Sequence, residues 1–294
     1  MKTNFQGTGV AIVTPFLIDG NIDFNSLSNL LEHIITNGVD FIVSLGTTSE
    51  AVTLTSAEKK EVMAFVINTV NGRVPVVMGM GGNNTAAVVE EIESTNFEGI
   101  DGILSVAPYY NKPNQRGIYQ HFDQIAEASP VPIILYNVPG RTSSNIAAET
   151  VLELARKHSN IIAVKEASGD LMQVMEIIKN KSKNFNVLSG DDALTFPMMA
   201  LGAKGVISVV ANAFPTEFSK MVNFSLEENY TKAQEIHYAL LEIIHQLFAD
   251  GNPAGIKAAL AILNICKNNL RLPMVAISDR HFSDLEILIN DFKI

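Results

Sequence analysis

The stretch Asn160-Ile-Ile-Ala-Val-Lys-Glu-Ala-Ser-Gly-Asp170 decides the fold class of this chain. Its four consecutive apolar residues, three of them β-branched, are typical of a strand buried on both faces, as in a parallel sheet covered by helices. Lys165 lies where that strand meets a polar loop. Desolvation there disfavours the ammonium form, so the free amine is available to attack a carbonyl and form a Schiff base. The alternative is a lysine whose stem packs under the loop while its charged end reaches water.

Short β-rich runs recur along the chain and alternate with segments of helical spacing. Eight runs are predicted as strands, at Val10–Val13, Phe41–Leu45, Val74–Gly79, Gly102–Val106, Val131–Asn137, Ile161–Lys165, Asn186–Ser189 and Val206–Val210. A capping box at Thr55-Ser-Ala-Glu58 predicts that a helix begins there. Eight strand–helix units in succession favour an α/β fold of the closed (β/α)8 kind, the TIM barrel, and an open doubly wound sheet is the alternative.

The pattern changes after the eighth strand. From Pro215 to Ile294 only helical stripes remain, around Phe218–Phe248, Ile256–Ile265 and Phe282–Phe292. This is more helix than one closing helix of a barrel requires. We therefore expect residues 1–225 to form the barrel that carries the active site, and residues 226–294 to form a small helical C-terminal extension packed on it.

Composition and charge exclude several classes of protein. The chain has 294 residues, of which 47% are hydrophobic, and a formal net charge of -10. An acidic surface argues against nucleic acid or an anionic membrane as a partner. The single cysteine, Cys266, fits a reducing compartment and lies in an apolar stretch typical of an inert buried thiol. No apolar run suits a signal peptide or a membrane span, so we expect a cytoplasmic protein.

Polar residues gather after the predicted strands, where a barrel of this kind places its active site. These loops are Thr14-Pro15, Gly46-Thr-Thr-Ser-Glu50, Gly79-Met-Gly-Gly-Asn83, Pro108-Tyr-Tyr-Asn111, Tyr136-Asn-Val-Pro-Gly-Arg-Thr142, Lys165-Glu-Ala-Ser-Gly169, Ser189-Gly-Asp-Asp192 and Ala211-Asn212. The residues that precede the strands are prolines or ordinary turn residues. This asymmetry predicts an enzyme site centred on Lys165.

Schiff-base chemistry needs groups that relay protons, because the carbinolamine must lose water and the enamine must exchange protons. Tyr136, one strand before Lys165, is the natural candidate, with Thr47 and one of Tyr109 or Tyr110 completing a relay. The alternative for each tyrosine is a half-buried ring whose hydroxyl donates to a backbone carbonyl.

Two features suit an anionic substrate. Arg141 follows a Pro-Gly turn and is able to hold a carboxylate through two hydrogen bonds; the alternative is a solvated surface arginine. The backbone N–H groups and hydroxyls of Gly46-Thr47-Thr48 are able to form an anion site for a keto acid, with an ordinary turn as the alternative. Asp191-Asp192 lacks further ligands nearby, so we interpret it as loop hydrogen bonding, and we expect no metal site.

These motifs, in register and in order, resemble those of the 4-hydroxy-tetrahydrodipicolinate synthases, also called dihydrodipicolinate synthases. The likeness runs from about Gly9 to the C-terminal helices and rests on Gly46-Thr-Thr-Ser-Glu50, Pro108-Tyr-Tyr-Asn-Lys-Pro113, Tyr136-Asn-Val-Pro-Gly-Arg-Thr142, Val164-Lys-Glu-Ala-Ser-Gly-Asp170, Ser189-Gly-Asp-Asp192 and Gly205-Val-Ile-Ser-Val209 with Ala211-Asn212. The resemblance implies a lyase of the lysine-biosynthetic diaminopimelate route that condenses pyruvate with L-aspartate 4-semialdehyde.

The resemblance also implies roles for single residues. Lys165 would carry pyruvate as a Schiff base, with Tyr136, Thr47 and Tyr110 as the proton relay, Tyr110 reaching across a tight dimer interface into the neighbouring site. Binding of the substrates would fall to Thr48 for the pyruvate carboxylate, Arg141 for the semialdehyde carboxylate, the Ile207 carbonyl near the Schiff base, and Gly190. The family's usual assembly is a homotetramer of two tight dimers, and neither a metal nor an organic cofactor takes part.

N-acetylneuraminate lyase and the keto-deoxy-sugar-acid aldolases resemble this chain at Tyr136 and Lys165 too. Arg141 favours the synthase, because an arginine suits a short substrate with a carboxylate near its aldehyde, whereas a polyol tail calls for neutral groups. A barrel that only senses a keto acid is a further alternative. The joint presence of a nucleophilic lysine and a proton relay argues against it.

The sequence departs from the family at two places. Ser49 stands where glycine is common, which the loop tolerates unless that residue needs positive φ. Feedback-sensitive members carry polar or histidine residues where this chain has Ala51, Val52, Ser56 and Lys59, and a glutamate at the position of Ala87, although Asn83 and Tyr109 remain as a residual effector site. A cationic effector would meet Lys59 in place of a carboxylate, so we expect weak or no inhibition by L-lysine.

Overall fold

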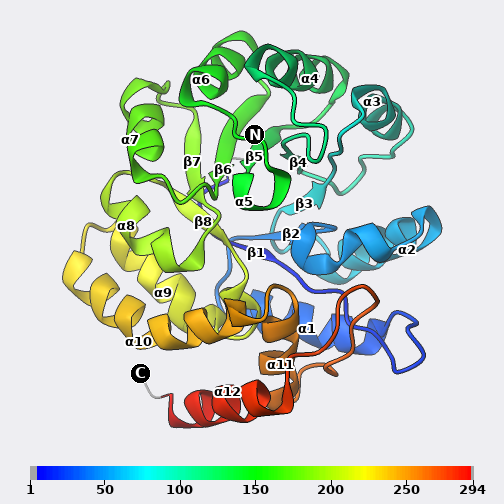
Figure 1. Ribbon diagram of the computed structural model, residues 1–294, viewed down its shortest axis with the longest axis vertical. Helices are drawn as coiled ribbons and strands as arrows, with labels where there is room; N and C mark the ends of the chain where they lie inside the picture. The colour runs from blue at the N-terminus through cyan, green and yellow to red at the C-terminus, as the bar shows by residue number, and fades with distance from the viewer. Residues whose placement is uncertain (1–4, 293–294) are drawn as a thin grey trace.

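A computed structural model of the protein describes residues 5–292 and shows a closed barrel of parallel strands ringed by helices (Figure 1). The strands follow one another in chain order, and the last pairs back to the first. They are β1 Gly7–Ala11, β2 Phe41–Ser44, β3 Val76–Gly79, β4 Gly102–Val106, β5 Ile133–Asn137, β6 Ile161–Glu166, β7 Asn186–Ser189 and β8 Gly205–Ser208. The predicted TIM barrel is confirmed, and the open-sheet alternative is wrong.

The first strand begins three residues earlier than the sequence pattern predicts. Gly7 and Gly9 lack the β-branched side chains that are typical of a strand, yet both are paired with neighbouring strands. Position 9 requires glycine, because a Cβ there would lie 2.2 Å from the Phe41 ring. The eighth strand ends at Ser208, two residues before the predicted end at Val210. There the chain turns into the short 3-10 helix η4, Val210–Asn212.

Helices cover the outside of the barrel. They are α1 Phe24–Thr36, α2 Ser56–Val70, α3 Thr85–Glu93, α4 Gln115–Ala128, α6 Ala148–Lys157, α7 Leu171–Asn180, α8 Thr195–Ala200 and α9 Pro215–Leu226. The short helix α5 Pro139–Thr142 and the 3-10 helices η1 Thr47–Ser49, η2 Ala51–Thr53 and η3 Asp192–Leu194 belong to the loops that follow the strands. The predicted capping box at the start of α2 is confirmed, since the Thr55 hydroxyl accepts from the Glu58 N–H and the Glu58 carboxylate accepts from the Thr55 N–H.

The buried side chains form two layers. The outer layer packs between strands and helices, as in Val164 and Leu135. The inner layer fills the barrel and consists of Phe5, Ala11, Phe41, Val43, Val77, Leu104, Ile134, Tyr136, Val138, Ala163, Leu188 and Ile207. Because successive strand residues point to opposite faces, Tyr136 points inward next to the outward Leu135. Because these side chains fill the interior, a ligand that approaches the barrel along its axis meets one of its two ends.

After β8 the described chain is helical, as predicted. The expected stripe Phe218–Phe248 is divided into α9 and α10 (Tyr230–Ala249), which pack against each other, and α11 (Ala254–Ile262) and α12 (Asp279–Asp291) follow on the same side of the barrel (Figure 1). Residues 1–4 and 293–294 of the two expected segments lie outside the described range. Within residues 5–292 no helix is both long and apolar enough to cross a membrane.

Candidate active site

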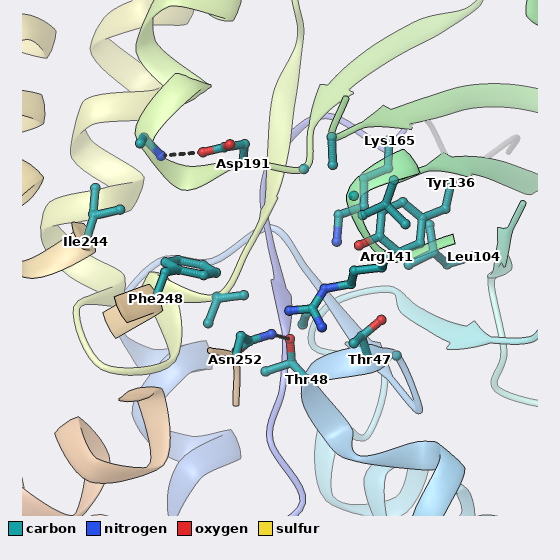
Figure 2. Close-up of a pocket in the computed structure, with 18 of the residues that line it drawn as sticks. Thr47, Thr48, Leu104, Tyr136, Arg141, Lys165, Asp191, Ile244, Phe248 and Asn252 are labelled. Atoms are coloured by element: carbon teal, nitrogen blue, oxygen red, sulfur yellow. Dashed lines mark hydrogen bonds between the residues drawn. The ribbon is translucent and has the colours of Figure 1, made fainter. Parts of the chain in front are cut away.

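A cavity of about 690 Å³ lies at the carboxyl end of the barrel strands, as the sequence predicts (Figure 2). Seven of the eight strands or the loops after them contribute to it, all but β3, and α10 forms its far wall. Its lining includes Ala11, Gly46, Thr47, Thr48, Leu104, Tyr136, Val138, Gly140, Arg141, Lys165, Ala167, Gly190, Asp191, Ala193, Val209, Ile244, His245, Phe248, Ala249 and Asn252. Six of the residues predicted to act together therefore line one cavity: Thr47, Thr48, Tyr136, Arg141, Lys165 and Gly190.

Lys165 is almost completely buried, with 5% of its surface exposed, and its amine points into the cavity. It is paired across β5 and β6 with Tyr136, and its Nζ lies 4.3 Å from the centroid of the Tyr136 ring. The alternative that this lysine extends to bulk water is wrong. An amine held beside a phenol at the closed end of a cavity suits attack on a small carbonyl compound.

Gly190 provides the space that the lysine stem occupies. A Cβ at this position would lie 3.0 Å from both Cγ and Cε of Lys165, and 2.7 Å from the Cβ of Ala167. The 2.7 Å contact is shorter than real Cβ contacts and the two at 3.0 Å are at the tight limit, so a larger residue would shift the loop after β6 and press on the lysine stem. Gly190 thus contributes to the site because the absence of a side chain leaves room for the stem of Lys165.

Glu166, the next residue after the lysine, points to the opposite face and is fully buried. Its carboxylate accepts hydrogen bonds from the Asn137 side chain at 3.1 Å, the Gln173 side chain at 2.9 Å and the Ser168 N–H at 2.8 Å. This network joins the loops after β5 and β6 and so fixes the end of the strand that carries Lys165. Sequence reasoning missed this role, although a carboxylate directly after an apolar strand is a signal of a buried network.

Thr47 and Thr48 form the turn η1 after β2. The Thr48 hydroxyl, itself buried, accepts a hydrogen bond from the Asn252 side chain at 3.0 Å, while Thr47 is exposed to the cavity. Ser49 does not adopt a positive φ. The residues of this loop that do are Leu45, at +59°, and Glu50, at +53°. Serine instead adds a bond, because its hydroxyl donates to the carbonyl of Ile12 at 2.7 Å.

Arg141 lies in α5, which begins with Pro139 at its first position. Its guanidinium points into the cavity between Lys165 and the η1 turn (Figure 2). Among residues 5–292 Arg141 forms no ion pair, so it is free to take a carboxylate. The opposite wall comes from α10, with Ile244, His245 and Phe248. Sequence reasoning missed these residues, because helical periodicity does not show which strands a helix covers.

Two predicted residues lie outside this cavity. Tyr110 is 88% exposed with φ at +72°, and a single chain does not bring its hydroxyl to Lys165. Ile207 is buried in the inner layer of the barrel, paired with Gly9 of β1. The predicted relay of Tyr136, Thr47 and Tyr110 is therefore only partly assembled within one chain.

A second cavity of about 350 Å³ adjoins the first and shares Thr47, Tyr136 and Arg141 with it. Lys59 and Tyr109 line it, as do Ala51, Val52 and Glu91. Asn83 lies beside it and donates to the Tyr109 carbonyl at 3.1 Å. Sequence reasoning missed Glu91, a carboxylate that faces the same space as Lys59.

Asp191 and Asp192 form loop hydrogen bonds, as predicted. Asp191 caps η3 through the N–H groups of Ala193 and Leu194, and Asp192 Oδ2 accepts from the N–H groups of Val209 and Val210 at 3.0 and 3.2 Å. Burial raises the pKa of Asp192 to about 6.

The described part of the chain brings no three potential His, Cys, Asp or Glu ligands together around one point. Cys266 is buried, and burial raises the pKa of its thiol to about 11, which suits the inert thiol that was predicted. The reactive groups that line the cavity include the Lys165 amine, the Tyr136 and Thr47 hydroxyls and the Arg141 guanidinium.

Comparison with known proteins agrees with this geometry. The model of the dihydrodipicolinate synthetase family matches residues 4–291. The chain is 54% identical to the 4-hydroxy-tetrahydrodipicolinate synthase of Parabacteroides distasonis over 92% of both chains. Its structure is similar to the crystal structure of dihydrodipicolinate synthase from Aquifex aeolicus, with a TM-score of 0.95, 42% identity and 98% of each chain covered.

A third similar structure is that of the chloride-inhibited dihydrodipicolinate synthase from Acinetobacter baumannii complexed with pyruvate. It has a TM-score of 0.94 and 37% identity, and the match covers 97% of this chain and 98% of that one. The matches extend over nearly the whole barrel and the C-terminal helices. The chain therefore belongs to the dihydrodipicolinate synthetase family.

Proposed function

We propose that this chain catalyses the 4-hydroxy-tetrahydrodipicolinate synthase reaction, the condensation of pyruvate with L-aspartate 4-semialdehyde on the diaminopimelate route to lysine. The observation that carries the proposal is the buried Lys165 amine, which faces the Tyr136 ring at 4.3 Å in a cavity that also receives the Arg141 guanidinium. A nucleophilic amine suits a keto acid, and the guanidinium beside it suits the carboxylate of a second substrate.

The reaction would begin when the free amine of Lys165 attacks the C2 carbonyl of pyruvate. The carbinolamine loses water to give an iminium, whose methyl group then loses a proton to give an enamine. The enamine carbon attacks the aldehyde carbon of the semialdehyde, and the new alkoxide takes up a proton. The adduct is then an iminium again, and the amino group of the semialdehyde attacks its carbon, closes the ring and, with transfer of its proton, releases the free amine of Lys165. Tyr136 and Thr47, which both line the cavity, are the groups within this chain that would carry these protons.

The positions of the remaining residues support roles in substrate binding. Thr48 would hold the pyruvate carboxylate through its N–H and hydroxyl, and the hydroxyl is oriented by Asn252. Arg141 would bind the semialdehyde carboxylate at the mouth of the cavity. Gly190 would leave room for the iminium beside the lysine stem, and the Ile207 carbonyl would lie below it.

The assembly we propose is a homotetramer of two tight dimers in the cytoplasm, with no cofactor. The support for a partner copy is the incomplete relay, since Tyr110 is exposed and outside its own chain's cavity. Tyr110 of a second copy would complete the relay of the first. We propose weak or no inhibition by L-lysine at the cavity near Tyr109, because Lys59 faces it, although Glu91 provides a compensating carboxylate.

Turnover tests the proposal, measured as NADPH oxidation by the downstream reductase with pyruvate and L-aspartate 4-semialdehyde, with and without L-lysine. Lys165→Met should abolish turnover. Lys181→Met, at the opposite end of the barrel, should leave turnover unchanged. Borohydride should trap a pyruvate adduct on the wild-type chain and none on Lys165→Met. A trapped adduct without turnover would favour a sister aldolase, and the absence of an adduct would favour a sensor. Strong inhibition by L-lysine would overturn only the feedback proposal.

A further inference from the structure

The turn that carries Thr47 and Thr48 is joined to the C-terminal helices by a buried ion pair. Glu50 follows the turn in the left-handed conformation, with φ at +53°, and its Oε1 lies 2.5 Å from the Nζ of Lys257 in α11. The two side chains are 1% and 0% exposed. The pair links residues separated by more than two thirds of the chain.

The remaining polar atoms of the pair are also satisfied. Glu50 Oε2 accepts from the Arg271 N–H at 3.0 Å, and Lys257 Nζ donates to the Asn269 carbonyl at 2.8 Å. The same Nζ lies 4.1 Å from the centroid of the Phe16 ring. Burial lowers the pKa of Lys257, and the Glu50 carboxylate opposes that effect. The pair is therefore a fully hydrogen-bonded buried group, not a chance surface contact.

A second link lies beside the first. Asn252, five residues before Lys257, donates its side-chain N–H to the Thr48 hydroxyl at 3.0 Å. The short segment from Asn252 to Lys257 thus contacts both the substrate-facing threonine and the residue that ends its turn. Figure 2 shows Asn252 and Thr48 together at the edge of the cavity.

A buried ion pair is weak support for stability, because desolvation of two charges offsets most of their attraction and an apolar pair of similar size would serve as well. The pair instead fixes the position of Glu50, because a buried, charged carboxylate has few alternative positions in which its hydrogen bonds can form. The turn that ends at Glu50 is fixed with it. We propose that Lys257 is a positioning residue that acts through Glu50 to hold Thr47 and Thr48 at the distance from Lys165 that pyruvate requires. This inference rests on the proposed function.

Lys257→Met tests the inference, since it keeps the length of the side chain and leaves the Glu50 carboxylate without its partner. Pyruvate binding, measured as the concentration that half-saturates borohydride trapping on Lys165, should weaken about tenfold or more. In Lys257→Met/Glu50→Gln, which removes both charges, the melting temperature should recover while pyruvate binding stays weakened. Recovery of both would show that the pair only balances charge, and would overturn the inference.

Leu285→Ala is the matched control. Leu285 is fully buried in α12, on the outer side of the C-terminal helices, so its truncation destabilises them without altering the Glu50 contacts. Pyruvate binding should be unchanged in this variant. Equal weakening in Leu285→Ala and Lys257→Met would overturn the inference. If Lys257→Met does not fold, Glu50→Gln should show a smaller weakening, and unchanged binding there would overturn it.

Hydrogen–deuterium exchange separates this inference from the proposed function. If the wild-type chain traps no pyruvate, the proposed function fails, but the contact between Lys257 and the turn can still be measured. Exchange of the backbone amides of residues 46–54 should then be faster in Lys257→Met than in the wild type, with β6 and β7 unchanged. Unchanged exchange at residues 46–54, or a uniform rise over the chain, would overturn the link itself.

Discussion

Lys165 and Tyr136 are direct partners across β5 and β6, and a one-residue shift in strand register makes them so. Ile133 pairs with Ile161, but Ile134 pairs with Ala163, so Ile162 is left without a partner. Without this shift Tyr136 would lie opposite Val164. The shift therefore turns the lysine to the inside of the barrel and places its Nζ 4.3 Å from the tyrosine ring.

Tyr136→Phe should separate formation of the pyruvate adduct from proton transfer. The ring would still face the Lys165 amine, but the hydroxyl that relays protons would be gone. Borohydride trapping of pyruvate should persist while turnover falls by about 100-fold or more. Tyr238→Phe, at a site in α10 that is 62% exposed, should leave turnover unchanged. Undiminished turnover in Tyr136→Phe would contradict the relay.

Gly190→Ala should reduce turnover at least about tenfold, because its Cβ would press on Cγ and Cε of Lys165 at 3.0 Å. The other close contact is with the Cβ of Ala167 at 2.7 Å, so the loss has two possible causes. Adding Ala167→Gly removes the contact with the Ala167 Cβ and keeps the contact with the lysine stem. Turnover should stay low in the double variant, and full recovery would show that the lysine stem is not the group displaced.

Glu166→Gln should lower the free energy of unfolding by about 2 kcal/mol, measured by urea titration. One carboxylate oxygen becomes an NH2 group that faces the N–H donors of Asn137 or Gln173, so a buried acceptor is lost and a buried donor is left unpaired. Glu176→Gln, on the exposed face of α7, should change stability little. Equal stability of the two variants would contradict the role given to the network.

Asp192→Asn should change how stability depends on pH. Burial raises the pKa of Asp192 from 3.8 to about 6, so the native state binds this proton more tightly than the unfolded chain does. The stabilisation is complete below pH 4 and is lost as pH rises through 6, by about 3 kcal/mol at most. Asparagine keeps an oxygen acceptor for the Val209 and Val210 N–H groups.

The measurement is the difference in unfolding free energy between wild type and Asp192→Asn at pH 4 and pH 7, which cancels the opposite contribution of other carboxylates such as Glu58. The wild type should lose stability relative to the variant as pH rises. A difference that is the same at both pH values would show that Asp192 does not titrate in this range.

Mixed assemblies test whether Tyr110 acts in the neighbouring site. Lys165→Met and Tyr110→Ala should each be nearly inactive alone. In a dimer of one of each, the site with the intact lysine would receive the intact tyrosine from its partner, so a refolded equal mixture should regain about a quarter of wild-type turnover. If Tyr110 acted in its own chain, the mixture would stay inactive.

The sequence by itself determined the strand order, the loops that carry the chemistry, and the identity of Lys165, Tyr136, Thr47, Thr48, Arg141 and Gly190 as cavity residues. These follow from local patterns, because buried parallel strands are apolar runs and barrel sites lie at their carboxyl ends. The division into residues 1–225 and 226–294 stays a proposal, supported by the packing of α10, α11 and α12 on one another beside the barrel.

Only the tertiary structure decided how these residues are held. The register shift at Ile162, the Glu166 network and the buried pair of Glu50 and Lys257 each join segments whose contact no local pattern encodes. The glycines of β1 are another case, because a side chain at Gly7 would collide with Asp40 and one at Gly9 with Phe41 of the neighbouring strand. Periodicity reports which face of an element is apolar, whereas pairing across the barrel depends on the packing of all the elements together.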